Sequence, residues 1–170
     1  TKNHRYGYAC INLHLREEEG ITASKGIQAK TFIEEGLDLC GELAFNNLLA
    51  LDRILEWNNS SGIELYRMPS GIFPWLTEYK ISDLPNWSDV RQLMCDIGRR
   101  IEGRSRVSFH PGPYNNLGSP SNRVVENTLR DLESHSTIMD WLEQAQSRQA
   151  KINIHLGGAD GCKDDVKRRF

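Results

Sequence analysis

The chain has 170 residues, of which 38% are hydrophobic and 26% are charged, with 14 Gly and 6 Pro. This composition fits one soluble globular domain over residues 1–170 and excludes collagen-like, low-complexity and disordered chains. The formal net charge of -2 lacks the broad basic excess of a typical nucleic-acid-binding domain, so any contact with DNA requires a local basic face.

In chain order, the first predicted element is a strand over residues 5–12, which is rich in aromatic and apolar residues. A helix over residues 43–57 follows, because Leu48, Leu51 and Leu55 recur at three- and four-residue steps. The remaining elements are a strand over 62–68, a helix from an N-cap at Ser88 to 103, a strand over 106–110, a helix from 119 to about 146, and a strand over 151–156. Strands that alternate with helices in this way predict repeated βα units with parallel strands.

Such units build either a doubly wound sheet or a (β/α)8 barrel. The fingerprint GxGxxG of a dinucleotide site is absent after the first strand, so we expect no dinucleotide cofactor. Polar residues stand at or just beyond the carboxyl ends of the four strands, namely Asn12, Arg67, His110 and His155. Barrel enzymes gather their chemistry at this edge. We therefore expect an α/β fold in which the chain forms about the first four βα units of a TIM barrel.

Two of these strand-end residues are histidines followed by sharp turns. His110 precedes Pro-Gly and His155 precedes Leu-Gly-Gly. Neutral imidazole binds Zn, Mn or Fe, and neighbouring parallel strands can bring two rings to one ion. A histidine at such a place can also be an ordinary hydrogen-bonded residue. A catalytic divalent site needs at least three protein ligands, and the sequence offers no Asp or Glu at a comparable strand end, so the predicted set is incomplete.

Five blocks of sequence, taken together, span most of the chain. The blocks are RYGYACINL from Arg5, the helix positions from Asn47 to Asn58, IELYRM from Ile63, SFHPGPYNNLGSP from Ser108, and HLGGA from His155 with a final Arg-Arg-Phe. Short motifs such as His-Pro-Gly are weak alone, but five blocks in order with compatible gaps make a specific signal. In this order the blocks resemble the UV damage endonuclease family.

This resemblance implies a metal-dependent barrel that nicks the DNA backbone immediately 5′ to cyclobutane dimers, (6-4) photoproducts and abasic sites. The implied partner is damaged double-stranded DNA, and the implied cofactors are divalent ions, with Mn expected and Zn or Mg as alternatives. By the same resemblance, His110 and His155 are metal ligands. Tyr8, Asn12 and Tyr114 match residues that face the DNA or wedge into it at the lesion. No catalytic residue is assigned beyond the metal ligands.

The chain departs from the family pattern at two positions. Pro113 stands where the family usually has a glutamine beside the tyrosine, so hydrogen-bonding capacity is lost there. Glu78 follows a stretch after which the family often has a metal-binding histidine, and its carboxylate is either a ligand for a hard cation or a solvated loop residue. Arg67, at a predicted strand end, is a further candidate for a contact with DNA phosphate.

Two other functions stay open. A sugar isomerase or epimerase on a related metal barrel would use the same strand-end histidines. A half-barrel that folds poorly, or that pairs with another copy, would be inactive alone, since an open parallel sheet exposes apolar surface. Barrels of this class need about 250 residues, the first residue is Thr1, and the chain stops at Phe170. We therefore expect an incomplete barrel whose remaining ligands lie beyond Phe170.

The expected location is the cytoplasm, with no membrane contact. The sequence has neither a signal-peptide core nor an apolar run of the about 20 residues that a membrane span requires. The sequence has four scattered cysteines without a CxxC pair, namely Cys10, Cys40, Cys95 and Cys162. This spacing predicts small buried side chains in a reducing compartment rather than a metal site.

Overall fold

A computed structural model describes residues 4–144, 150–154 and 161–169 of the chain, which contain one four-stranded parallel sheet. The strands are β1 (Gly7–Ala9), β2 (Leu65–Pro69), β3 (Arg106–His110) and β4 (Lys151–Ile152). Their order in the sheet, β1-β2-β3-β4, is the order of the chain. The α/β fold with a parallel sheet is thereby confirmed, and its order lacks the reversal that defines a doubly wound fold.

Strand β3 has the predicted bounds, but β1 is shorter than the predicted strand over residues 5–12. It stops because the backbone of Cys10 turns into the left-handed region, with φ of 63°. The Cys10 N–H then donates to the carbonyl of Arg67, at 2.8 Å. Strand β2 begins at Leu65 instead of residue 62, after a turn at Ser61 and Gly62. The last predicted strand falls partly outside the described residues.

In the part of the chain that the structure describes, five α-helices connect or follow the strands. Helix α2 includes the predicted helix over residues 43–57 but begins earlier, with a kink at Gly36, where φ is 62°. Helix α1 was not expected, because only Leu15 of its residues is buried and it shows no apolar periodicity. The helices are α1 (Leu13–Glu19), α2 (Ala29–Ser60), α3 (Trp87–Ile101), α4 (Asn122–Trp141) and α5 (Lys163–Arg169), with short 3-10 helices η1 (Ser70–Ile72), η2 (Leu76–Glu78) and η3 (Ile81–Asp83).

Two predicted helix ends are wrong. The N-cap position of α3 is Asn86 rather than Ser88, and the Asn86 side chain donates to the carbonyl of Gly41 in α2 at 3.0 Å instead of capping its own helix. Helix α4 ends at Trp141 rather than near residue 146, because Glu143 takes a positive φ of 54° that a helix does not accommodate.

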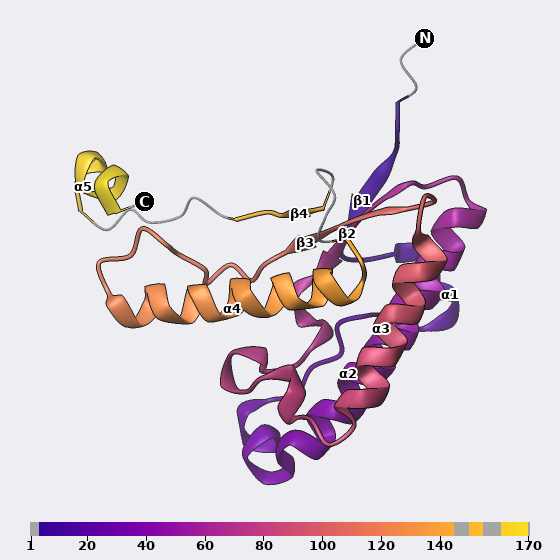
Figure 1. Cartoon of the computed structure of the whole chain (residues 1–170), viewed down its shortest axis with the longest axis horizontal. Helices are drawn as coiled ribbons and strands as arrows, with labels where there is room; N and C mark the ends of the chain where they lie inside the picture. Colours follow the sequence, from indigo (N-terminus) through magenta and orange to yellow (C-terminus); the bar gives the residue numbers. More distant parts are fainter. Residues whose placement is uncertain (1–3, 145–149, 155–160, 170) are drawn as a thin grey trace.

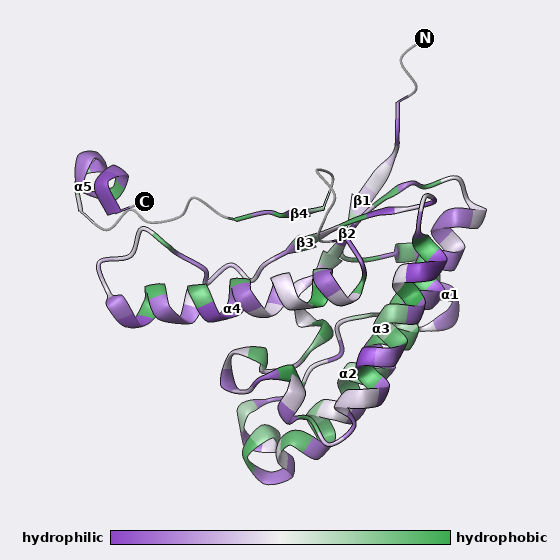
Figure 2. Ribbon diagram, in the orientation of Figure 1, coloured by the Kyte–Doolittle hydropathy of each residue, from purple (hydrophilic) through white to green (hydrophobic). Residues whose placement is uncertain are grey.

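The hydrophobic core lies between one face of the sheet and helices α2, α3 and α4 (Figure 1). Alternate strand residues point to this face, so Tyr66 and Met68 of β2 lie beside Val107 and Phe109 of β3, all four of them buried. Burial of each large side chain contributes about 1.5–3 kcal/mol. Figure 2 shows hydrophobic residues where α2 and α3 run side by side, whereas α5 is largely hydrophilic.

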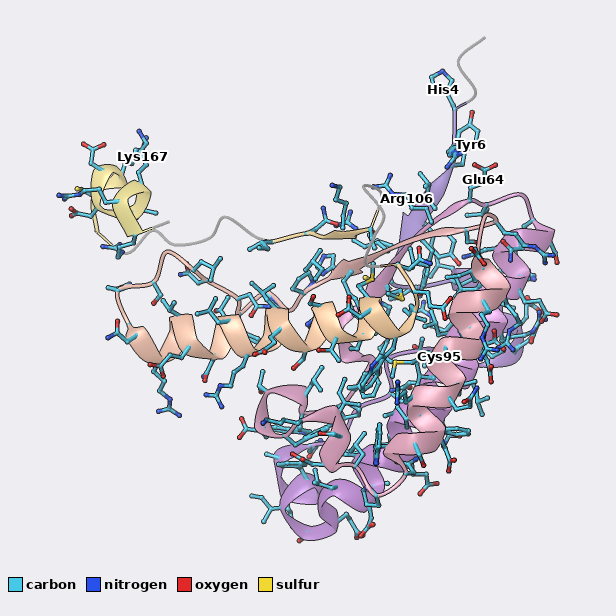
Figure 3. All side chains as sticks on the ribbon, in the orientation of Figure 1. His4, Tyr6, Glu64, Cys95, Arg106 and Lys167 are labelled. Carbon is cyan, nitrogen blue, oxygen red and sulfur yellow. The ribbon has the colours of Figure 1, made fainter. Side chains whose placement is uncertain are left out.

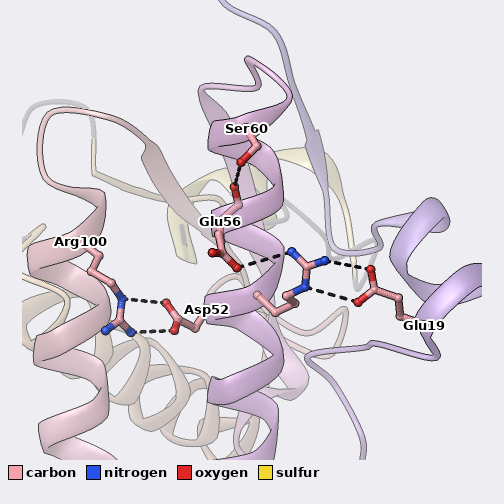
Figure 4. A network of polar contacts seen from close by, with 6 residues as sticks. Glu19, Asp52, Glu56, Ser60 and Arg100 are labelled. Carbon is pink, nitrogen blue, oxygen red and sulfur yellow. Dashed lines mark hydrogen bonds and ion pairs between the residues drawn. The ribbon is translucent and has the colours of Figure 1, made fainter.

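Ion pairs on the surface of α2 link it to α1 and α3 (Figure 4). The Arg53 guanidinium lies 2.9 Å from the Glu19 carboxylate and 3.5 Å from that of Glu56. Asp52 pairs with Arg100 of α3 at 2.7 Å. Each of these exposed pairs contributes about 0–1 kcal/mol, so burial of apolar side chains, rather than charge, holds the helices on the sheet.

All four cysteines are free, and their burial differs from the prediction. Cys40 is buried, Cys10 and Cys95 are partly exposed, and Cys162 is exposed. In the part of the chain that the structure describes, no helix is both long enough and apolar enough to cross a membrane.

Candidate functional site

The face of the sheet opposite the helices is open and polar. It forms a depression of about 410 Å³ whose lining includes Arg5, Arg67, Arg106, Ser108 and Asn153. Figure 3 labels Arg106 at the amino end of β3, together with Glu64 just before β2. The Arg5 guanidinium is balanced by the Glu64 carboxylate at 3.0 Å. Three arginine side chains therefore gather on this face, although the composition as a whole shows no basic excess.

Arg67 belongs to this open face, but the prediction that it ends a strand is wrong. Strand β2 continues from Arg67 to Pro69, and Arg67 pairs in register with Ala9 on one side and Ser108 on the other. Its half-buried side chain therefore lies on the face of the sheet, short of its carboxyl edge. Burial raises the pKa of the nearby Cys10 thiol, and the Arg67 charge opposes that rise.

His110 is the last residue of β3, as predicted, and its imidazole is half-buried. The ring Nδ1 lies 3.1 Å from the carbonyl of Pro111. Because a carbonyl can only accept a hydrogen bond, Nδ1 carries the proton in this contact and the lone pair of the neutral ring is on Nε2. Nε2 is the nitrogen that a metal ion would bind. A strand-end imidazole in this tautomer fits the role of one ligand.

The other two predicted ligands do not complete a metal site with His110 in the part of the chain that the structure describes. His155 lies outside the described residues. Glu78 ends the 3-10 helix η2 and is exposed. Among residues 4–144, 150–154 and 161–169, no three His, Cys, Asp or Glu side chains are grouped so that they could hold a metal ion. The predicted ligand set of His110, His155 and Glu78 stays a prediction.

Tyr8 and Asn12 form a hydrogen-bonded group beneath the sheet. Asn12 donates through Nδ2 to the Tyr8 hydroxyl at 2.8 Å, and that hydroxyl donates to Oδ1 of Asn58 in α2 at 2.7 Å. The Tyr8 ring packs edge-on against Tyr66, with centroids 5.2 Å apart. Burial raises the pKa of Tyr8, and the two asparagine contacts partly offset this. Tyr8 therefore lies on the helix-covered face with Tyr66, not on the open face with Arg67.

Asn12 stands after β1, but its side chain caps a helix. Its Oδ1 accepts the N–H of Leu15 at 3.0 Å, so Asn12 is the N-cap of α1 and is only 5% exposed. Sequence reasoning missed Asn58 as the partner of Tyr8, although Asn58 lies in one of the resemblance blocks. The predicted contacts of Tyr8 and Asn12 with a lesion stay predictions.

Tyr114, unlike Tyr8 and Asn12, is exposed to solvent. It lies in the loop between β3 and α4 and is 90% exposed, more than any other large hydrophobic residue that the structure describes. Helix α5 contacts the same loop, because the Arg169 guanidinium donates to the carbonyl of Gly118 at 2.8 Å. Figure 3 places Lys167 on this helix. An exposed aromatic ring thus stands on the loop that follows His110, and Arg169 of α5 contacts the same loop at Gly118.

Comparison with known proteins decides between the possible relatives of this fold. The sequence model of a family described as UV-endonuclease UvdE matches residues 4–170. The chain belongs to this family. The family indicated by the five sequence blocks is thereby confirmed. The matched region includes the strand-end His110 and the solvent-exposed Tyr114.

Named relatives of this UvdE-family chain agree with the match. The UV-damage endonuclease of Schizosaccharomyces pombe is 31% identical over 170 residues, which cover 98% of this chain and 28% of that protein. The UV DNA damage endonuclease of Clostridium perfringens is 30% identical over 167 residues, covering 98% of this chain and 38% of that protein. The crystal structure of SacUVDE superimposes with a TM-score of 0.81 at 31% identity, covering 97% of this chain and 53% of that one. The chain thus spans about half, or less, of the length of these relatives.

Removal of the Tyr8 hydroxyl tests the hydrogen-bonded group of Tyr8, Asn12 and Asn58 in this UvdE-family chain. Tyr8→Phe should lower the free energy of unfolding by about 1–3 kcal/mol, because Asn12 Nδ2 and Asn58 Oδ1 are left without their partner. Urea unfolding of the intact protein measures this. Tyr6→Phe is the matched control, since Tyr6 is 72% exposed and a surface change should stay within about 0.5 kcal/mol. Equal stability of Tyr8→Phe and wild type would contradict the structural role.

Proposed function

We propose that this chain is part of a DNA-repair endonuclease that nicks the backbone 5′ to UV photoproducts and abasic sites. The observation that carries the proposal is the family match over residues 4–170. The relatives are named for UV-damage endonuclease activity. The chain provides an imidazole at the carboxyl end of β3, arginine side chains on the open face of the sheet and an exposed aromatic ring on the loop after β3.

The proposed architecture is a (β/α)8 barrel, to which the chain contributes four consecutive βα units. The sequential parallel order of the strands supports it, and so does the placement of α1 to α4 on one side of the sheet (Figure 1). In such a barrel the open face with Arg67 and Ser108 would line the interior. The carboxyl edge with His110 would carry the active site.

We propose His110 as a metal ligand through Nε2, with His155 and Glu78 as further ligands, and Mn as the expected ion, with Zn or Mg as alternatives. A bound divalent ion would supply an activated water and would neutralise charge on the scissile phosphate. The contact between Nδ1 and the Pro111 carbonyl orients the His110 ring, as outer contacts of metal-binding histidines generally do.

Damaged duplex DNA is the proposed partner, and Tyr114 is the proposed contact with the lesion. An aromatic ring that is 90% exposed can stack where a damaged base pair has lost its stacking, and damaged steps cost the least to open. Pro113 precedes it and provides no side-chain hydrogen bond, so the proposed recognition relies on stacking. Arg67 is a proposed phosphate contact. Tyr8 and Asn12 would stabilise the carboxyl edge of the sheet from its helix-covered face.

Salt-dependent binding separates this function from a sugar isomerase or epimerase. The intact protein should bind a duplex with one abasic site, and neutralisation of about three phosphates would raise the Kd about 40-fold between about 50 and 200 mM salt. Fluorescence anisotropy with a labelled duplex measures this. An undamaged duplex of the same sequence is the control. Failure to bind the damaged duplex more tightly than the control would overturn the proposed function.

A further inference from the structure

The loop that carries Tyr114 is anchored to α4 through the two residues that follow the ring, Asn115 and Asn116. Tyr114 itself is 90% exposed, but the next residue, Asn115, is 7% exposed. The backbone N–H of Asn116 donates to Oγ1 of Thr128 at 3.0 Å, and Thr128 is 1% exposed. Asn116 in turn accepts the N–H of Gly118 through Oδ1 at 3.0 Å. The largely exposed Tyr114 ring is thus adjacent to backbone that several hydrogen bonds hold in place.

The strongest of these contacts joins Asn115 to Asp131 of α4. Nδ2 of Asn115 donates to Oδ2 of Asp131 at 2.6 Å. This is a charge-assisted hydrogen bond in a partly buried place, where such bonds are strong. Its partners are 16 residues apart in the sequence, so it ties the loop to the middle of the helix rather than to its own turn.

Asp131 is itself held in place from the core. Nδ1 of His135 donates to the backbone carbonyl of Asp131 at 2.6 Å and lies 3.5 Å from its Oδ1. The His135 ring packs edge-on against Phe109, with centroids 4.3 Å apart. Phe109 directly precedes His110 in β3. A continuous set of contacts therefore runs from the strand that ends in His110, through His135 and Asp131, to the residue beside Tyr114.

We propose that Asp131 and Asn115 are positioning residues that hold Tyr114 ready to stack in damaged DNA. This inference rests on the proposed function, because it assigns the clamp to the lesion contact of Tyr114. A loop that is already ordered loses less conformational entropy on binding, so the clamp raises affinity without touching the DNA. We call the Asn115–Asp131 pair the loop clamp.

Reversal of the hydrogen bond tests the loop clamp. Asn115→Asp places two carboxylates at a 2.6 Å contact, and loss of a charged hydrogen bond with added repulsion should weaken binding to an abasic-site duplex about tenfold. In the double variant with Asp131→Asn, the new Asn donates to the new Asp, while its Oδ1 keeps its place beside His135. The double variant should recover to within about threefold of wild type.

A second pair of variants asks whether the clamp acts through Tyr114. In a Tyr114→Ala background, Asn115→Asp should change the Kd less than about twofold, because the group that it positions is gone. Asn122→Asp is the matched control, since it adds the same charge at an exposed residue that begins α4. At saturating damaged DNA, kcat should be unchanged in the clamp variants while KM rises. If the contact had only a structural role, Asn115→Asp would weaken DNA binding by the same factor in the Tyr114→Ala background and in the wild-type protein.

Hydrogen exchange gives a readout that needs no DNA. The Asn116 amide, bonded to Thr128, should exchange at least about fivefold faster in Asn115→Asp and return to the wild-type rate in the double variant. Faster exchange with unchanged affinity would overturn the positioning role of the clamp. If the wild-type protein does not prefer the damaged duplex, the proposed function is overturned. An unchanged exchange rate of the Asn116 amide in Asn115→Asp would refute the loop clamp independently of that result.

Discussion

His110→Ala is expected to lower lesion-dependent nicking by the intact protein at least about 100-fold, because loss of even an outer contact of a metal ligand costs 10- to 100-fold. The half-buried imidazole ends β3 and directs Nδ1 to the Pro111 carbonyl. The substitution would therefore remove Nε2, the proposed ligand atom of the metal. Steady-state nicking of an end-labelled duplex with one lesion, in Mn²⁺, measures kcat. Affinity for the same duplex should change little, because Tyr114 and Arg67 are intact.

His4→Ala is the matched control for this prediction. His4 is exposed and precedes β1, far in the sequence from the strand end. Its removal should leave kcat within about twofold, as surface substitutions usually do. Full nicking activity in His110→Ala would remove His110 from the proposed metal site, whereas a loss of activity in both variants would point to damage to the fold.

Tyr114→Ala carries the second large effect, on binding rather than on chemistry. Stacking of an aromatic ring on a base contributes about 1–3 kcal/mol, so the Kd for a damaged duplex should rise about 5- to 150-fold. Because Tyr114 is 90% exposed, its removal should change the free energy of unfolding by less than about 0.5 kcal/mol. Anisotropy titrations with damaged and undamaged duplexes, together with urea unfolding, measure both quantities.

Tyr114→Phe should keep the affinity within about threefold, since the stacking ring is retained. Tyr6→Ala removes another exposed tyrosine, 72% accessible and just ahead of β1, and should leave binding unchanged. Equal affinity of Tyr114→Ala and wild type for the damaged duplex would contradict a wedge role. An equal loss on damaged and undamaged duplex would show that Tyr114 serves general DNA binding instead.

Much of the fold follows from sequence pattern alone. The strand over residues 106–110 and the alternation of strands and helices were predicted because buried strands and amphipathic helices have distinct apolar periods. Arg67 was misplaced because the hydrophobic run gives no sign that β2 continues to Pro69. Helix α1 escaped prediction because it has one buried residue, Leu15, and therefore no period to detect.

The candidate site was predictable only where a residue's role is local. His110 is followed by Pro-Gly, and a strand-end histidine before a turn is visible in the sequence. The orientation of Tyr8 could not be predicted, because it depends on how the three-residue strand β1 pairs with β2. The contact of Asn115 with Asp131 could not be predicted either, because it joins a loop residue to a helix residue and no periodic pattern indicates it.

Lesion-directed cleavage of DNA is the function proposed for this chain, and one measurement tests it most directly. The intact protein is incubated with Mn²⁺ and a duplex that carries a single cyclobutane dimer, labelled at either end, and the product length is read on a sequencing gel. We predict one nick immediately 5′ to the dimer, abolished by chelation of the metal and absent from the undamaged duplex. Equal cleavage of damaged and undamaged DNA, or no cleavage by a folded protein that binds the damaged duplex, would contradict the account.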